Sequence, residues 1–381
     1  MQLRLSIAAA TIIVSMALEA EDYVSVQFLQ YDETLNRTSV SAPSLMINKD
    51  LGTDYTLNAN VVLDSVSGAS ETYYDGASGA SAFSRGKGVN AKDVEYGNVE
   101  YSDQRAAGGL SLTKRFTNRD ELIVGTNYSA ESDFYSTEFS AEYMHWLGRS
   151  KNSSLSFGLS YQMNEILVSC KENSQCDAES GASQKMNADI LNVQASYFQN
   201  INAKSYAKVS LFYIADSGYL SNPYLNVVRN YVQGSTADVV AEVRPDTRSA
   251  YGAMFKYANA LSDDISLHLS YRYYSDDWEI SSHTLDSDLF YELGENWIFK
   301  LGLRYYTQSE ASFYNGTKDY FTDETYASSD QRLSKFDAIT YKTSVDYAFA
   351  KDLRLNFGAS YYDQTTGIKA TYFTTGFRYN F

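Results

Sequence analysis

The chain has 381 residues, a formal net charge of −16, 34 Tyr, 19 Phe and only 3 Pro. The acidic balance argues against nucleic-acid binding, because proteins that bind nucleic acids carry basic surfaces. Many aromatic residues and few Pro favour long β-strands, since aromatic side chains fit a pleated surface and Pro removes a backbone donor. Beyond the N-terminus, no apolar stretch approaches the roughly 20 residues that a membrane-spanning helix needs.

The N-terminus has the pattern of a secretory signal peptide. Arg4 precedes an apolar run, residues 5–18, which is too short to cross a bilayer and is followed by small residues. Cleavage after Ala17 and cleavage after Ala20 both fit the pattern. We therefore assign residues 1–20 to a signal peptide and begin the fold argument at residue 21.

Alternating apolar and polar residues recur through the rest of the chain and predict about sixteen strands. These are expected at 23–33, 37–49, 55–66, 103–116, 121–131, 133–147, 153–168, 186–199, 204–215, 248–260, 264–276, 278–292, 296–308, 335–349, 352–363 and 367–381. An even number of strands is the rule for bacterial single-chain barrels. The mean hydropathy of −0.37 is also compatible with a membrane barrel, because only alternate residues of a barrel strand face lipid.

The predicted connections alternate in length. Short, turn-rich connections at 50–54, 117–120, 148–151, 200–203, 261–264, 294–296 and 350–352 fall at every second junction, and the longer ones include 67–102, 169–185, 216–247 and 309–334. Short periplasmic turns and longer outer loops are typical of outer-membrane barrels, and here they place both termini on the periplasmic side. The predicted fold class is therefore all-β. We expect residues 21–381 to form a single transmembrane up-and-down antiparallel β-barrel in the bacterial outer membrane.

The last strand shows the two faces of such a barrel most clearly. Phe377, Tyr379 and Phe381 fall on one face, and Arg378 falls on the other. The aromatic ending resembles the terminal strand and assembly signal of Gram-negative outer-membrane barrels. Aromatic residues at strand ends are expected to form two interfacial girdles: Trp146, Tyr291, Trp297, Tyr347 and Tyr379 at the periplasmic end, and Tyr135, Tyr161, Tyr273 and Tyr305 at the outer end.

The two cysteines lie close together in a polar segment. In an oxidising compartment we expect a disulfide between Cys170 and Cys176. A metal site is not expected there, because no second Cys/His pair lies nearby at ligand spacing. The sequence predicts no catalytic, cofactor or metal site.

Charged residues on the predicted inward face form a basic wall in the C-terminal half, opposite an acidic wall on strand 133–147. The predicted lumen-lining residues are Lys256, His268, Arg272, Asp286, Asp288, Lys300, Arg304, Lys342, Asp346, Arg354, Arg378, Glu138 and Glu142. Two interpretations stay open. Opposed walls in a wet pore would favour polar or anionic solutes. Alternatively, cross-strand charge pairs simply fill the interior, with Asp286 and Asp288 next to the basic residues.

Several segments resemble one family of proteobacterial outer-membrane proteins, the domain of unknown function 3570. They include Tyr23-Val-Ser-Val-Gln-Phe-Leu-Gln-Tyr31, Asp64-Ser-Val-Ser-Gly-Ala-Ser70, Ser78-Gly-Ala-Ser81, Gly218-Tyr-Leu-Ser-Asn-Pro-Tyr224, Arg244-Pro-Asp-Thr-Arg248, Tyr271-Arg-Tyr-Tyr274, Ser282-His-Thr-Leu285, Arg304-Tyr-Tyr-Thr-Gln-Ser309 and Ser329-Asp-Gln-Arg-Leu333. The resemblance implies an outer-membrane barrel and brings no activity. Nearly all of these segments fall at outer strand ends or in long outer loops. Loops with defined structure, folded into the mouth, and ordinary loop turns are both compatible with that placement.

The leading functional hypothesis is a passive, porin-like channel or transporter for small polar solutes. The alternative is a loop-plugged, non-conducting barrel with a role in envelope assembly or interaction. A lipid-active outer-membrane enzyme is less favoured, because no motif places any of His145, His268 and His283 within reach of a nucleophile. Only His283, at an outer strand end beside Asp276 and Asp277, is a candidate. The partners expected are outer-membrane lipid and lipopolysaccharide, the barrel-insertion machinery and periplasmic chaperones.

Overall fold

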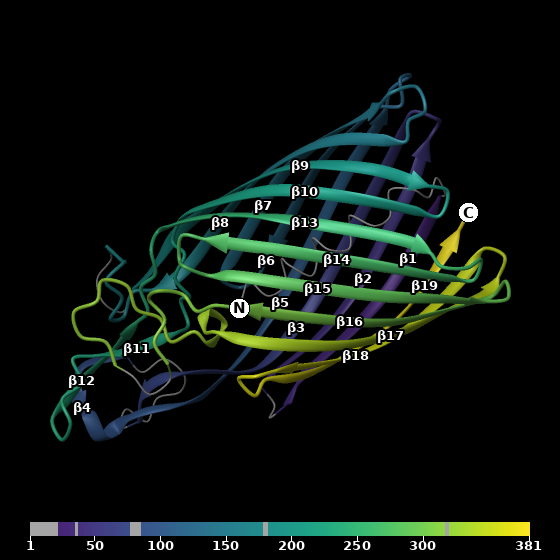
Figure 1. The fold of residues 1–381 in the computed structure, drawn as a ribbon. Helices are drawn as coiled ribbons and strands as arrows, with labels where there is room; N and C mark the ends of the chain where they lie inside the picture. The colour runs from purple at the N-terminus through teal and green to yellow at the C-terminus, as the bar shows by residue number, and fades with distance from the viewer. Residues whose placement is uncertain (1–21, 35–36, 77–84, 178–181, 317–319) are drawn as a thin grey trace.

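The computed structural model describes residues 22–34, 37–76, 85–177, 182–316 and 320–381, and these form one closed antiparallel barrel of sixteen strands (Figure 1). The predicted fold class is thereby confirmed. The expected signal peptide lies outside the described residues. None of the helices in the described residues is long and apolar enough to cross a bilayer.

The strands of the barrel follow each other around the wall in chain order. They are β1 (Tyr23–Glu33), β2 (Thr38–Leu51), β3 (Tyr55–Asp75), β5 (Val94–Arg115), β6 (Glu121–Ala130), β7 (Phe134–Leu147), β8 (Ser153–Ser169), β9 (Ser183–Asn202), β10 (Ser205–Gly218), β13 (Thr247–Ala260), β14 (Ile265–Asp276), β15 (Ser281–Leu293), β16 (Trp297–Gln308), β17 (Phe336–Ala350), β18 (Leu353–Gln364) and β19 (Lys369–Asn380). Each of the sixteen overlaps a predicted strand. The predicted loop 67–102 was too long, because β3 continues to Asp75 and β5 begins at Val94.

The barrel closes between its first and last strands. Tyr23 lies opposite Asn380, and the backbone N–H of Phe381 donates to the carbonyl of Asp22 at 2.9 Å. Asp22 and Phe381, the first and last described residues, therefore lie at the end of the barrel that carries the short turns. Several of those turns contain glycine with a positive φ, such as Gly52 (73°) and Gly148 (65°), where a side chain would be strained.

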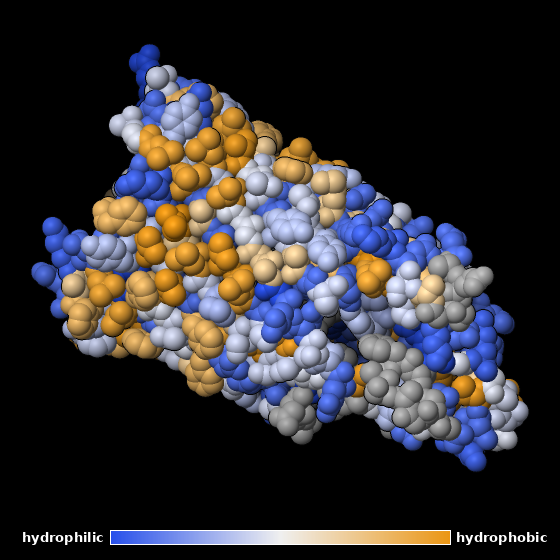
Figure 2. Space-filling model, turned by 180° about the vertical axis from the view of Figure 1, so that it is seen from behind, coloured by the Kyte–Doolittle hydropathy of each residue, from blue (hydrophilic) through white to orange (hydrophobic). Residues whose placement is uncertain are grey.

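The outward face of the wall is apolar, as predicted. Its exposed residues include Phe157, Leu159, Leu211, Leu301, Phe357, Phe373, Phe377 and Tyr379. Figure 2 shows hydrophobic residues gathered over the strands and hydrophilic residues toward the two ends, so the band has the position expected for a lipid-facing surface. One girdle prediction was wrong. The Trp146 ring packs against the lumen-facing Phe198, with centroids 6.3 Å apart, because Trp146 alternates with the outward Tyr143 and Tyr135.

A folded cap extends from the outer end of the wall. We use this name for the described parts of four connections: those between β3 and β5, β8 and β9, β10 and β13, and β16 and β17. The cap contains a three-stranded sheet in the order β11 (Asn226–Arg229), β12 (Thr236–Ala241) and β4 (Gly86–Asn90), and the short 3₁₀ helices η3 (Ala91–Asp93) and η4 (Gln331–Leu333). Its strands alternate like those of the wall, since Ala237, Val239 and Ala241 are buried.

Candidate functional site: lumen wall and outer cap

The centre of the basic wall is an ion-pair network. Asp286 and Asp288, on β15, accept from cations on both β16 and β17. Lys342 Nζ lies 3.1 Å from Asp286 Oδ1 and 2.9 Å from Asp288 Oδ1. Lys300 Nζ lies 3.1 Å from Asp288 Oδ2, and Arg304 Nε lies 2.8 Å from Asp286 Oδ1. These cations are therefore held by carboxylates on neighbouring strands.

Three other predicted basic residues lie on the neighbouring strands β13 and β14. The His268 ring lies against Phe290, with centroids 4.9 Å apart, and Arg272 lies over the Phe212 ring at 4.8 Å. Lys256, on β13, lies directly opposite Lys208 of β10, a residue not singled out from the sequence. His268 and Arg272 thus pack against lumen aromatics, whereas Lys256 faces a second cation.

The remaining predicted lumen residues lie further round the wall. Arg354 and Arg378 are cross-strand partners, and the Arg378 guanidinium lies 3.9 Å from the Tyr23 ring centroid. Asp346 accepts a hydrogen bond from Asn356 at 2.8 Å. Two predicted acidic residues lie on β7. Glu138 accepts a hydrogen bond from Asn127 at 3.2 Å, and Glu142 lies opposite Gly158. Because β7 and β16 lie on opposite sides of the ring, the two acidic residues face the basic wall.

The cap has a buried ionic core. Glu242 has no exposed surface, and Arg244 and Asp330 are each 6% exposed. Arg244 Nε lies 2.6 Å from Glu242 Oε1, and its Nη2 lies 2.8 Å from Asp330 Oδ2. Burial alone would raise the pKa of Asp330, but the charges of Arg332 and Arg244 outweigh it and hold that pKa well below its usual range. Two segments that carried the family resemblance, 244–248 and 329–333, thus meet in one ion-pair cluster.

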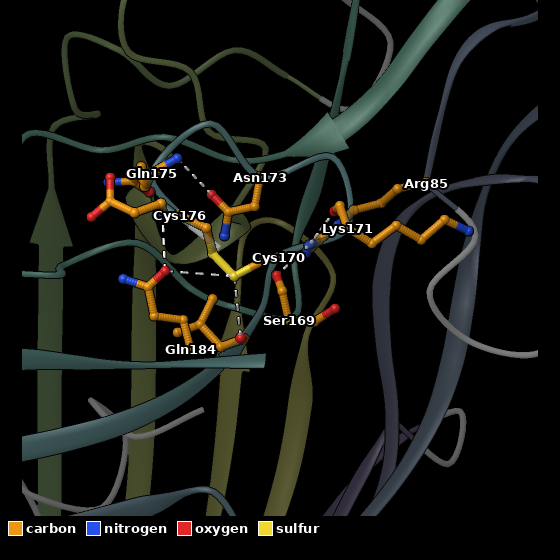
Figure 3. Close-up of a disulfide and its surroundings, with 10 residues drawn as sticks. Arg85, Ser169, Cys170, Lys171, Asn173, Gln175, Cys176 and Gln184 are labelled. Carbon is orange, nitrogen blue, oxygen red and sulfur yellow. Dashed lines mark hydrogen bonds between the residues drawn. A yellow bond between two sulfur atoms is a disulfide. The ribbon is translucent and has the colours of Figure 1, made fainter. Parts of the chain in front are cut away.

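Arg85 joins three of the cap connections. Arg85 is only 4% exposed. Its Nε donates to Asn226 Oδ1 at 2.6 Å, and its Nη2 donates to the Pro223 carbonyl at 2.8 Å. From Nη1 it also donates to the carbonyls of Ser169 and Lys171, at 3.4 and 3.2 Å, beside the disulfide (Figure 3). The burial of this guanidinium lowers its pKa from the usual value.

The disulfide shapes the loop that receives Arg85. Cys170 and Cys176 are bonded, with Cα atoms 5.5 Å apart. The Gln184 side chain accepts from the backbone N–H of Asp177 at 3.0 Å and so ties the loop to β9. The carbonyls of residues 169 and 171 are thereby held on either side of Cys170, pointing at Arg85 (Figure 3).

Side-chain contacts link the cap to the connection between β1 and β2. Arg37, between β1 and β2, donates to Gln331 Oε1 at 3.5 Å and forms an ion pair with Glu71 at 3.0 Å. The residue next to Gln331 is Asp330, which holds Arg244 of the connection between β10 and β13. In the order of the strands, β1 and β10 stand on opposite sides of the ring. These contacts therefore join connections that leave the wall on opposite sides of the ring.

Sequence reasoning also missed two groups at the rims. Ligand oxygens of Asp103, Glu131 and Asp133 converge within 4.8 Å of one another at the outer rim. Burial and the charge of Asp103 raise the pKa of Glu131 to about 7. At the rim with the short turns, Asp120 accepts a hydrogen bond from Tyr143 at 2.7 Å and lies 2.8 Å from His145 Nδ1. These contacts hold the turn between β5 and β6 against β7. No spacing pattern marks either group, because their members meet only through strand pairing.

The closed wall with short turns at one end and folded loops at the other defines a β-barrel of the outer-membrane type. The chain matches the family model described as "Protein of unknown function (DUF3570)" over residues 3–373. It therefore belongs to this family, and the resemblance seen in its sequence segments is confirmed. No curated protein matches the sequence.

Solved structures similar to the chain are outer-membrane barrels of low sequence identity. CdiB from Acinetobacter baumannii has a TM-score of 0.52 at 9% identity, over 95% of this chain and 60% of that chain. A mutant ferric enterobactin receptor from Pseudomonas aeruginosa has a TM-score of 0.46 at 10% identity, over 91% of this chain and 54% of that chain. The CymD monoaromatic hydrocarbon channel has a TM-score of 0.41 at 10% identity, over 95% of this chain and 88% of that chain. The chain spans 54–60% of the length of the first two, and the similarity shows the fold alone.

Proposed function

We propose that the protein is a resident outer-membrane barrel whose outer mouth is closed by the cap. It differs in this respect from a porin with a permanently open mouth. The observation that carries the proposal is the chain of contacts from Arg37 through Gln331 and Asp330 to Arg244, which joins opposite sides of the ring. Removing one partner of such a buried ion pair leaves an uncompensated charge, so loss of Arg244 is expected to open the cap.

The lumen network supports the same function. The passive-channel hypothesis rested on cations hydrated by pore water, yet Lys300, Lys342 and Arg304 all lie within 3.1 Å of carboxylates. Such pairs lower the field that a passing anion would feel, because two carboxylates compensate most of the charge of these three cations locally. The loop-plugged alternative therefore has more structural support than the open channel.

The apolar outward band and the aromatic last strand support residence in the outer membrane. We expect its partners to be outer-membrane lipid and lipopolysaccharide around the band, and the insertion machinery and periplasmic chaperones during assembly. The proposal assigns no catalysis. His283 forms a hydrogen bond with Tyr271 at 2.8 Å, His145 is held by Asp120, and His268 packs against Phe290.

Planar-bilayer recording of the purified protein tests this function. The wild type should show no conductance steps under conditions that open a control porin, whereas the double variant Arg85→Ala/Arg244→Ala should conduct. The Lys87→Ala variant is the control, because Lys87 is an exposed cap cation whose ion pair with Glu172 contributes little. Steady steps from the wild type would overturn the closed mouth. Silence of a folded double variant would show that the cap is not what closes the barrel.

A further inference from the structure

The lumen contains a pair of lysines that the barrel itself does not compensate. Lys208 of β10 and Lys256 of β13 are directly opposed in the strand register. Their side chains share the lumen face, because each strand alternates with the outward Val209 and Phe255. Directly opposed residues have Cβ atoms about 4.5–5.5 Å apart, and like charges at that position destabilise a sheet.

The acidic residues nearby are already occupied. Asp286 is the acidic residue that acts electrostatically on Lys256, and it is held by Arg304 and Lys342. Among the described residues, neither Lys208 nor Lys256 has a carboxylate within 4.0 Å. The Asp286–Asp288 network has three cations for its two carboxylates, so it cannot neutralise two more lysines.

A recess lies next to this pair toward the periplasm. It has a volume of about 250 Å³ and is lined by the β9–β10 turn and by the periplasmic ends of β13 and β14. Tyr206 and Ala258 are part of the lining. Along the inward faces of their strands, Tyr206 is the position before Lys208, and Ala258 is the position after Lys256. His268, whose side chain shares the lumen face, adds a polar group that can donate a hydrogen bond.

We infer that Lys208 and Lys256 form a binding site for a small anion with two negative charges, which enters from the periplasmic side through this recess. A dianion would neutralise the unfavourable lysine pair, and lysine ammonium groups bind phosphate and carboxylate as point charges. The site does not depend on whether the cap closes the outer mouth. It goes beyond the proposed function in assigning a ligand class to the lumen.

Amine acylation of the full-length barrel in detergent, read by peptide mass spectrometry, tests the site. The probes are inorganic phosphate and succinate, each compared with chloride at equal ionic strength. At least one dianion should slow acylation of both Lys208 and Lys256 several-fold, and leave exposed Lys335 unchanged. Protection by phosphate alone or by succinate alone would identify the chemistry of the ligand. No protection by either dianion would overturn the inference.

Unfolding midpoints supply a second measurement. The dianion that protects should raise the wild-type midpoint but not that of Lys208→Gln/Lys256→Gln. Without ligand, the double variant should unfold no earlier than the wild type, since it loses only repulsion. Lys342→Gln is the matched lumen control, and its midpoint should fall because it removes the cation that bridges Asp286 and Asp288. A double variant that unfolds earlier and is still stabilised by the dianion would assign the lysines a structural role instead.

Discussion

The barrel wall and the cap are built on different physics. The wall repeats one rule, with apolar residues outward and polar or small residues inward, and its backbone groups are paired around a closed ring. The cap packs around buried apolar clusters, such as Tyr73, Val228 and Val239, and also buries charge at Glu242, Arg244, Asp330 and Arg85. The wall therefore tolerates many substitutions that keep the alternation. In the cap, each buried charge depends on a specific partner side chain.

The largest effect is expected in the cap. Arg244→Met should destabilise the cap by about 3–5 kcal/mol, because Glu242 and Asp330 are left as buried, undercompensated charges. Since loops can open without the wall unfolding, the loss should appear as faster hydrogen exchange and proteolysis of residues 223–244 with an unchanged heat-modifiable gel band. Lys87→Ala serves as the exposed control. Equal protection in Arg244→Met and the wild type would contradict the ionic-core description of the cap.

The next effect separates the two faces of the wall at neighbouring positions of β8. Leu159→Arg places a charge in the lipid-facing band and should cost about 2–4 kcal/mol if the site is near the bilayer midplane. Gly158→Arg should cost much less, since a Cβ there meets no atom closer than 4.0 Å and Glu142 lies opposite. Urea unfolding in lipid vesicles measures both. Equal losses would show that the inward face is not polar and hydrated.

The disulfide should matter to the cap more than to the wall. Replacing Cys170 and Cys176 by Ser removes a cross-link over a separation of 6 residues, for which the chain-entropy model gives about 2 kcal/mol. Exchange should quicken first in residues 169–171, whose carbonyls hold Arg85. Ser169→Ala is a suitable control, because the backbone carbonyl used by Arg85 is retained. A shift of the unfolding midpoint of the whole barrel as large as that of the cap would contradict a local role for the disulfide.

The sequence allowed the wall to be predicted in detail and the cap only in outline. Period-two alternation is a local signal, so all sixteen strands followed from it, whereas the placement of the first and last strands followed from the alternating lengths of the connections. The wrong girdle position of Trp146 came from weighing its place at a strand end above the same alternation. Arg85 carries no local signal, because its partners Asn226 and Pro223 lie 141 and 138 residues away. The ion pairs of Asp286 and Asp288 could be predicted, because their partners lie on neighbouring strands. The opposition of Lys208 and Lys256 could not, because it depends on the exact register of two strands joined by a long connection.

The smallest effect is expected at the outer rim, between wall and cap, where Glu131 is surrounded by Asp64, Asp103, Asp133 and Arg105. The folded state raises the pKa of Glu131 to about 7 from its ordinary value of 4.5, chiefly through burial and the charge of Asp103. Between these two values the folded protein binds more protons than the unfolded chain, so stability should fall as the pH rises, with the full loss reached above pH 7. Glu131→Gln remains neutral at every pH and should remove that loss.

The variant should therefore match the wild type in unfolding midpoint near pH 4 and exceed it at pH 8. Glu100→Gln, at an exposed position of β5, is the control and should follow the wild-type profile. Because only one partly exposed carboxyl is changed, the difference should be the smallest of the four. A Glu131→Gln midpoint below that of the wild type at pH 8 would mean that ionised Glu131 stabilises the rim, contrary to the crowding of carboxylates seen there.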